Sequence, residues 1–153
     1  MKQLNDKIIT WLKHHNIDKL SPDKQYLKIL EEVGELARGL LKNDFEAIKD
    51  AIGDIYVALV GYSLQHDIQE VYVKNEEFNG GSHTLSSLQS FLYVLYDKSY
   101  NPSFYDFRTL ITFIDLIAFN NNLTLKECVS HAYNEIKDRE IKIKNRVAVK
   151  NEN

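Results

Sequence analysis

Apolar residues recur every three or four positions along nearly the whole chain, a spacing that places them on one face of an α-helix. Alternating spacing, which indicates a half-buried strand, is sustained almost nowhere. The helical pattern is clearest in two segments, Ile8, Ile9, Trp11 and Leu12 near the start and Leu85, Leu88, Leu92 and Leu95 further on. The sequence therefore predicts an all-α protein of five or six helices.

Two long helices are expected early in the chain, joined by a very short turn. Ser21 can cap the first helix and Pro22 suits its first turn, so that this helix covers about residues 22–41. Asp44 can cap the second, expected at about residues 45–66. Because so short a connection joins neighbours in space, the two helices should pack antiparallel.

The helical pattern loosens between residues 67 and 83. Residues 71–73, Val-Tyr-Val, could form a short extended piece, and residues 79–82, Asn-Gly-Gly-Ser, are a clear break. We expect a flexible loop at this break.

Helical spacing resumes at residue 85, is interrupted at 101–102, and continues to a turn at 120–122. Thr124 with Glu127 three residues later has the arrangement of a capping box. A last helix is expected from Leu125 into the basic stretch at residues 142–146. We expect one domain over residues 1–149 and a frayed polar tail at 150–153.

Charge and cysteine content exclude several classes of function. The formal net charge of −3 gives no basic field that could hold a nucleic-acid duplex. Cys128 is the only cysteine, so an intrachain disulfide and a cysteine-based zinc site are both excluded. No segment approaches the roughly 20 apolar residues of a membrane span. We expect a soluble, cytoplasmic protein with no membrane partner.

The acidic pairs on the two early helices are the residues that indicate a metal-binding or catalytic site. Glu32 and Glu35 are three residues apart and Asp50 and Asp54 are four apart, so each pair shares a helix face. Like charges at this spacing destabilise a helix slightly, and both pairs lie among apolar residues that must pack. A divalent cation such as Mg²⁺, which takes oxygen ligands and often shares positions with substrate phosphates, would relieve the repulsion.

With these helices, the chain resembles the MazG-like nucleoside triphosphate pyrophosphohydrolases, an all-α family whose signature is Glu-x-x-Glu on one helix and Glu-x-x-Asp on the next. The first half of the signature matches closely around Glu32 and Glu35. The second half departs from it, because Ala51 stands where the second glutamate is usual. Asp50, one residue earlier, is the acid available to pair with Asp54.

A third matching piece, residues 132–139, resembles the helix that supplies polar substrate contacts in phage and prophage members of the family. The resemblance implies a four-helix core with an additional helical hairpin, and a homodimer or higher homo-oligomer. It also implies Mg²⁺-dependent hydrolysis of a nucleoside or deoxynucleoside triphosphate to the monophosphate and pyrophosphate, with Mn²⁺ as a substitute metal.

The resemblance also assigns roles to individual residues. The expected metal ligands are Glu32, Glu35, Asp50 and Asp54, and the expected catalytic residues are Glu31, Glu32 and Glu35. The expected substrate contacts are Lys28, Asn134, Lys137 and Arg139. The base needs an apolar or aromatic slot, for which the candidate walls are Trp11, Tyr56 and Tyr133.

Several alternatives stay open at this point. The acids could form a solvated face, with Asp50 paired to a lysine such as Lys49 or Lys42. The chain could be a non-catalytic helical adaptor or regulatory protein that keeps the fold, which the departure at Ala51 would support. A His-Asp phosphohydrolase centred on His66 would release inorganic phosphate instead.

Two glycines, Gly34 and Gly53, are expected in helix interiors, where glycine costs up to about 1 kcal/mol relative to alanine. A close approach of the two helix backbones would explain both.

Overall fold

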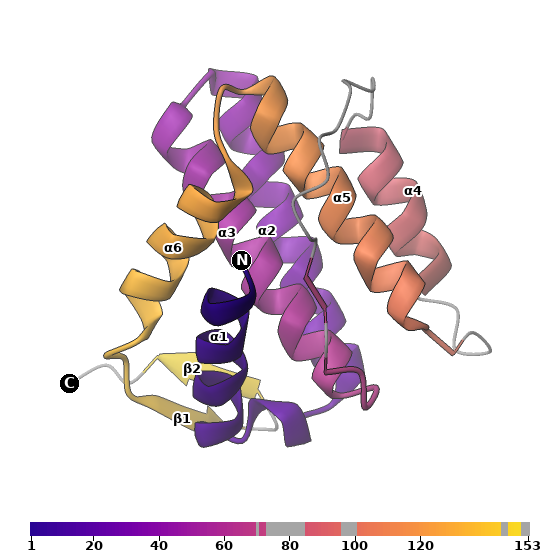
Figure 1. Ribbon diagram of the computed structural model, residues 1–153, viewed down its shortest axis with the longest axis vertical. Helices are drawn as coiled ribbons and strands as arrows, with labels where there is room; N and C mark the ends of the chain where they lie inside the picture. The colour runs from indigo at the N-terminus through magenta and orange to yellow at the C-terminus, as the bar shows by residue number, and fades with distance from the viewer. Residues whose placement is uncertain (70, 73–84, 96–100, 145–146, 151–153) are drawn as a thin grey trace.

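The computed structural model describes residues 1–69, 71–72, 85–95, 101–144 and 147–150 (Figure 1). Over these residues the chain forms six α-helices, one short 3₁₀ helix and a two-stranded sheet. The expectation of an all-α fold with five or six helices is confirmed, with the small sheet as an addition. Within the described parts, no helix is both long and apolar enough to cross a membrane.

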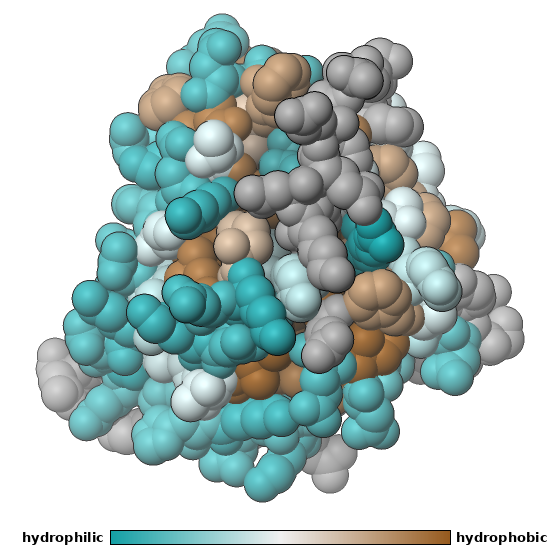
Figure 2. Space-filling view, viewed as in Figure 1, coloured by the Kyte–Doolittle hydropathy of each residue, from teal (hydrophilic) through white to brown (hydrophobic). Residues whose placement is uncertain are grey.

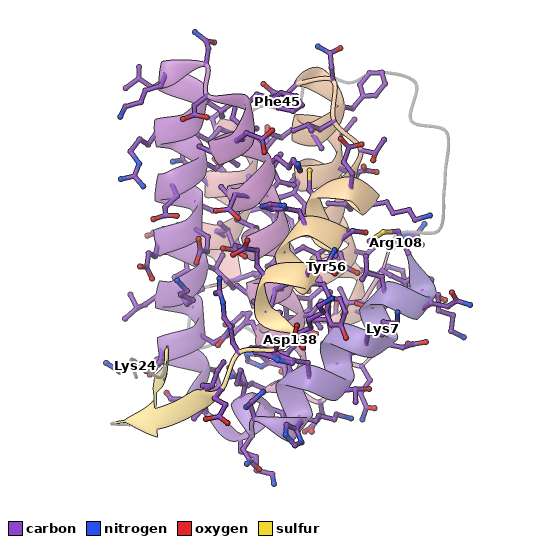
Figure 3. All side chains as sticks on the ribbon, turned by 90° about the vertical axis from the view of Figure 1, so that its left-hand side faces the viewer. Lys7, Lys24, Phe45, Tyr56, Arg108 and Asp138 are labelled. Carbon is purple, nitrogen blue, oxygen red and sulfur yellow. The ribbon has the colours of Figure 1, made fainter. Side chains whose placement is uncertain are left out.

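The first half of the chain folds as its capping signals predict. Helix α1 (Lys2–His14) and the 3₁₀ helix η1 (Ile17–Lys19) precede α2 (Pro22–Lys42) and α3 (Phe45–Leu64). The turn between α2 and α3 consists of Asn43, in the left-handed conformation at φ 51°, and Asp44, whose Oδ1 accepts a hydrogen bond from the Ala47 N–H at 3.1 Å. This short turn makes α2 and α3 antiparallel neighbours (Figure 3).

The second half contains α4 (Leu85–Leu95), α5 (Phe104–Asn120) and α6 (Leu125–Ile136). A capping box joins Thr124 and Glu127 at the start of α6, as the sequence predicts. Residues 71 and 72 have no regular structure, while residue 73 and the expected loop at 79–82 lie outside the described residues.

The prediction for the last helix was wrong. Helix α6 ends at Ile136, and the basic stretch forms an antiparallel hairpin of β1 (Ile141–Lys144) and β2 (Val147–Lys150). Apolar residues alternate with basic ones in β1, Ile-Lys-Ile-Lys, which is the two-residue period of a strand. Lys150 therefore belongs to a strand rather than to a tail, and residues 151–153 lie outside the described part.

Helix α3 is the centre of the core and packs against α2, α6, α5 and α1. It is apolar on almost every side, a composition typical of a helix that is surrounded by other helices. On the face that carries α1 and α6, hydrophilic side chains cover most of the described surface, with small apolar areas between them (Figure 2).

The two mid-helix glycines have different surroundings. A Cβ atom on Gly53 would lie 2.8 Å from Ala132 Cβ and closer still to the Cys128 carbonyl oxygen, so Gly53 lets α6 approach α3. A Cβ atom on Gly34 would meet nothing within 4 Å among the residues described. The expected close approach of α2 to α3 was wrong as the reason for both glycines, because Gly53 lies against α6 and Gly34 lies against no described residue.

Candidate functional site

Glu32 is a buried acid on the side of α2 that faces the core. The residue is 3% exposed, and its Oε1 lies 2.5 Å from the Lys28 Nζ one turn earlier on the same helix. Burial raises the pKa of Glu32, while the ammonium of Lys28 opposes that rise. Lys28 also contacts the Glu31 Oε2 at 3.0 Å, so one lysine neutralises two neighbouring carboxylates.

Asp54 is the second acid of the site and is half-buried on α3. Burial raises its pKa to about 7, and the negative charges of Glu32 and Asp50 add to this shift. The cations Lys28 and Arg139 act in the opposite direction. Residues from α2, α3 and the segment after α6 thus lie within electrostatic range of one another, as the acidic motif predicts for Glu32, Asp50 and Asp54.

Asp50 has a partner that the sequence analysis missed. Its Oδ1 lies 3.4 Å from the Nε2 of His131 on α6, whereas Lys49 pairs with Glu46. The sequence signal for His131 was its position three residues before Asn134, on a helix already expected to face the site. The alternative in which Asp50 pairs with a lysine receives no support from these ion pairs.

The remaining predicted acids lie nearer to solvent. Glu31 is exposed, and Glu35 is half-exposed with its Oε1 3.3 Å from Arg38 Nη2. Across the described ranges, no three acidic, histidine or cysteine side chains are arranged as a ready metal site. The carboxylate oxygens are the donors that Mg²⁺ prefers, but an ion held by all four predicted ligands would have to displace Lys28, Arg38 and His131 from them.

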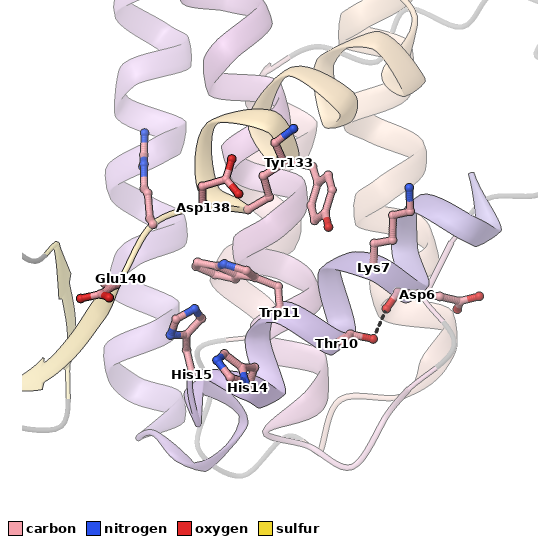
Figure 4. A pocket seen from close by; sticks show the side chains of 11 residues that line it. Asp6, Lys7, Thr10, Trp11, His14, His15, Tyr133, Asp138 and Glu140 are labelled. Atoms are coloured by element: carbon pink, nitrogen blue, oxygen red, sulfur yellow. Dashed lines mark hydrogen bonds between the residues drawn. The ribbon is translucent and has the colours of Figure 1, made fainter.

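A cavity of about 550 Å³ opens between α1 and the segment that follows α6 (Figure 4). Trp11 from α1 and Tyr133 from α6 provide aromatic walls, and basic side chains line the remainder together with several acids and two histidines. The lining residues are Asp6, Lys7, Thr10, Trp11, His14, His15, Tyr133, Lys137, Asp138, Arg139 and Glu140.

The indole nitrogen of Trp11 is covered. It is buried and has no hydrogen-bond partner among the described residues. Trp11 therefore offers the cavity its indole ring rather than its N–H. Of the three expected aromatic walls, Trp11 and Tyr133 line the cavity, whereas Tyr56 belongs to the core, where its hydroxyl donates to Asn5 Oδ1 at 2.9 Å.

Arg139 connects the cavity with the acidic cluster. It lines the cavity, its Nη2 lies 2.8 Å from Glu135 Oε2, and its charge weakly opposes the rise in the pKa of Asp54. Lys137, the other expected cation, also lines the cavity, whereas Asn134 is exposed and is not part of the lining. Lys7, whose Nζ lies 6.0 Å from the Tyr133 ring centroid, is a further cation of the cavity that the sequence analysis missed.

Two other residues of chemical interest do not line the cavity. The His66 ring contacts Tyr62 and Phe107 at centroid distances of 4.7 and 6.5 Å, and burial lowers its pKa. Cys128 is a buried residue of α6, and burial raises the pKa of its thiol to about 12, which disfavours a nucleophilic thiolate.

Comparisons with known proteins give limited information on function. The chain is 39% identical over 75 residues to an uncharacterized 18.2 kDa protein from the rep–hol intergenic region of Haemophilus phage HP1. The match covers 48% of this chain and 46% of the phage protein, so the two correspond over slightly less than half of their lengths. No protein-family model matches the chain. No solved structure matches it either.

Proposed function

We propose that the protein hydrolyses nucleoside or deoxynucleoside triphosphates to the monophosphate and pyrophosphate in a Mg²⁺-dependent reaction. Water attacks the α-phosphorus, the bond from that phosphorus to the bridging oxygen of the β-phosphate breaks, and pyrophosphate leaves. The proposal also places the chain among MazG-like all-α pyrophosphohydrolases of the phage type.

One observation carries this proposal. An acidic cluster with an Asp54 pKa of about 7 adjoins, through Arg139, an open cavity with aromatic walls and cations. A metal-bound triphosphate needs acids for the metal, cations for the phosphates and a flat apolar slot for the base. Acids, cations and aromatic rings on neighbouring parts of α1, α2, α3, α6 and the segment after α6 support the proposal.

Glu32 and Asp54 would hold a metal from the buried side, and Glu35 and Asp50 would hold it from the rim once their present partners were displaced. Mg²⁺ would neutralise the phosphates and acidify the attacking water. Displaced from Glu32, the Lys28 ammonium would become available to a phosphate oxygen. Lys137 and Arg139 bind further phosphate oxygens, Arg139 with the fork geometry that suits them.

The base stacks against the rings of Trp11 and Tyr133. Glu31 is exposed next to Glu32 and can accept a proton from the attacking water, while Asn134 contacts substrate only at the outer rim. This division separates the chemistry on α2 and α3 from base recognition on α1 and α6.

The test is incubation of the purified protein with each common nucleoside triphosphate and Mg²⁺, with separate assays for pyrophosphate and inorganic phosphate. We expect pyrophosphate and the monophosphate, and no pyrophosphate from the Glu35→Gln variant. Release of inorganic phosphate alone, or equal pyrophosphate from Glu35→Gln, would contradict the proposal. Trp11 is the only tryptophan, so its fluorescence reports nucleotide binding directly.

A second function, a non-catalytic adaptor or regulatory protein, is favoured by the Lys28 contacts. Lys28 already compensates the charges of Glu31 and Glu32 without a metal. An adaptor of this kind would change its Trp11 fluorescence with nucleotide, or not respond at all, but would release no pyrophosphate at any Mg²⁺ concentration. The product assay therefore separates the two functions.

A further inference from the structure

Glu32 is a buried carboxylate whose charge is balanced by a lysine attached at the surface of α2. The Glu32 side chain is 4% exposed and that of Lys28 is 50% exposed, and the Lys28 Nζ lies 2.5 Å from Glu32 Oε1. In the pair of Lys49 with Glu46 on α3, by contrast, the carboxylate side chain is 72% exposed, so water can solvate it. Glu32 therefore depends on its cation far more than Glu46 does.

The contact between Lys28 and Glu32 is not explained by the stability of α2 itself. For two residues four apart on a helix the more favourable order is an acid followed by a base, and here the lysine comes first. The same ammonium also contacts Glu31 Oε2 at 3.0 Å, so a single positive charge serves two carboxylates. The need of the buried Glu32 for a counter-charge is the better explanation.

Lys28 can leave this position without disturbing the core. Its flexible stem begins at an exposed position on α2, so the ammonium can move into water when another cation takes its place. Glu32 has no such freedom, because its side chain is held inside the helix bundle. Since the ammonium reaches Glu32 from the solvent side, a cation that enters from solvent meets the ammonium first.

A bare divalent ion and the Lys28 ammonium exclude each other from Glu32. Both are positively charged, and two cations held close together in a site largely removed from water repel each other strongly. A triphosphate changes this balance, because its oxygens offer the displaced ammonium a new negative partner. Binding of the ion and binding of the triphosphate are therefore coupled, and the coupling acts equally in both directions.

We propose that Lys28 is a displaceable counter-ion that keeps a bare metal ion off Glu32 and admits the ion only as a metal–triphosphate complex. The inference rests on the proposed function, since it takes Glu32 as a metal ligand and a triphosphate as the substrate. It adds that the protein holds no tightly bound ion between turnovers. The ammonium that leaves Glu32 then helps to hold the complex.

The first test compares the binding of Mn²⁺ alone, followed by the loss of its free-ion electron paramagnetic resonance signal at pH 8, above the pKa of about 7 that burial gives Asp54. Lys28→Met should bind Mn²⁺ at least about tenfold more tightly than the native protein, the effect of one charge-assisted hydrogen bond on an affinity. Lys28→Arg keeps the positive charge and should bind as weakly as the native protein. Lys49→Met removes the same charge from the exposed Glu46 and is the matched control, which should bind like the native protein.

The second test uses Mg²⁺ complexes of α,β-imido deoxynucleoside triphosphates, whose nitrogen bridge resists cleavage, with the fluorescence of Trp11 as the readout. Lys28→Met should bind these complexes more weakly than the native protein, by roughly tenfold, because a phosphate contact is lost. One substitution thus acts in opposite directions on the bare ion and on the complex. A variant that had lost its fold would bind both more weakly, and circular dichroism would show the loss.

Mn²⁺ binding by Lys28→Met that is no tighter than that of the native protein, including no binding by either, would overturn the proposal. Tight Mn²⁺ binding by the native protein or by Lys28→Arg would do the same, as would equal binding of the complex by Lys28→Met and the native protein. None of these readouts involves turnover, so each result leaves pyrophosphate release as a separate question. Tighter Mn²⁺ binding by Lys28→Met together with no pyrophosphate release from the native protein would contradict the proposed function alone.

Discussion

Gly34 and Gly53 are both mid-helix glycines beside acidic residues, yet the structure gives them opposite surroundings. At Gly53 the backbones of α3 and α6 are so close that a methyl group does not fit, whereas Gly34 faces open space. The difference shows that the core side of the α2–α3 pair is filled by the chain itself, while the outer side of α2 at Gly34 meets no other described residue. The acidic cluster belongs to the filled side, where burial acts on its charges.

The largest effect is expected on the rate of the proposed reaction, from a change at Asp54 on the packed side of α2 and α3. Asp54→Asn keeps the shape of the side chain but removes a metal-binding charge, so pyrophosphate release should fall by about 100-fold or more. Glu46→Gln changes an exposed acid at the start of α3 and serves as the control. Equal rates of pyrophosphate release from Asp54→Asn and the native protein would show that Asp54 is not part of the site.

Gly53→Ala tests the close packing of α3 against α6. The added methyl group would overlap the Cys128 carbonyl and the Ala132 side chain, so α6 must move away from α3. We expect the free energy of unfolding to fall by about 1–3 kcal/mol in urea denaturation. An unchanged midpoint would mean that α6 does not pack as closely as described.

The pH dependence of stability tests the burial of Asp54. Its pKa is raised from 3.8 to about 7 in the folded protein, so between these values the folded state binds more protons than the unfolded state. In metal-free buffer, stability should therefore decrease from about pH 4 to about pH 7 and then level off. Asp54→Asn should remove this part of the decrease, measured as the difference between the two proteins' thermal midpoints at each pH.

The smallest effect is expected at Gly34. Because a methyl group there meets nothing within the described chain, Gly34→Ala should raise the free energy of unfolding by up to about 1 kcal/mol. A loss of stability as large as that of Gly53→Ala would show that Gly34, like Gly53, has no room for a methyl group.

Local signals in the sequence predicted most of the helices, because their caps depend on residues close in the chain. Ser21, Asp44 and Thr124 stand before α2, α3 and α6 as expected. The end of α6 was not predicted, because the expected helix was continued over residues 141–144, whose own alternation is that of a strand. Boundaries without a capping signal are decided by tertiary packing, which one sequence does not display.

The candidate site was predictable in part for the same reason. Helical spacing placed Glu32 and Asp54 towards each other, since both lie on the packed faces of antiparallel neighbours. Spacing alone could not predict that His131 pairs with Asp50, or that Lys28 already contacts Glu32, because these contacts depend on side-chain conformation. The cavity around Trp11 depends on how α1 meets the segment after α6, a long-range contact with no local signal.

The proposed pyrophosphohydrolase activity depends on Glu32 and Asp54 as a metal-dependent site. It is tested by the rate of pyrophosphate release as Mg²⁺ is titrated, for the native protein, Glu32→Gln and the exposed control Glu46→Gln. We expect a rate that rises with Mg²⁺ and saturates in the native protein and the control, and that is lost in Glu32→Gln. A rate independent of Mg²⁺, or equal in all three proteins, would contradict it.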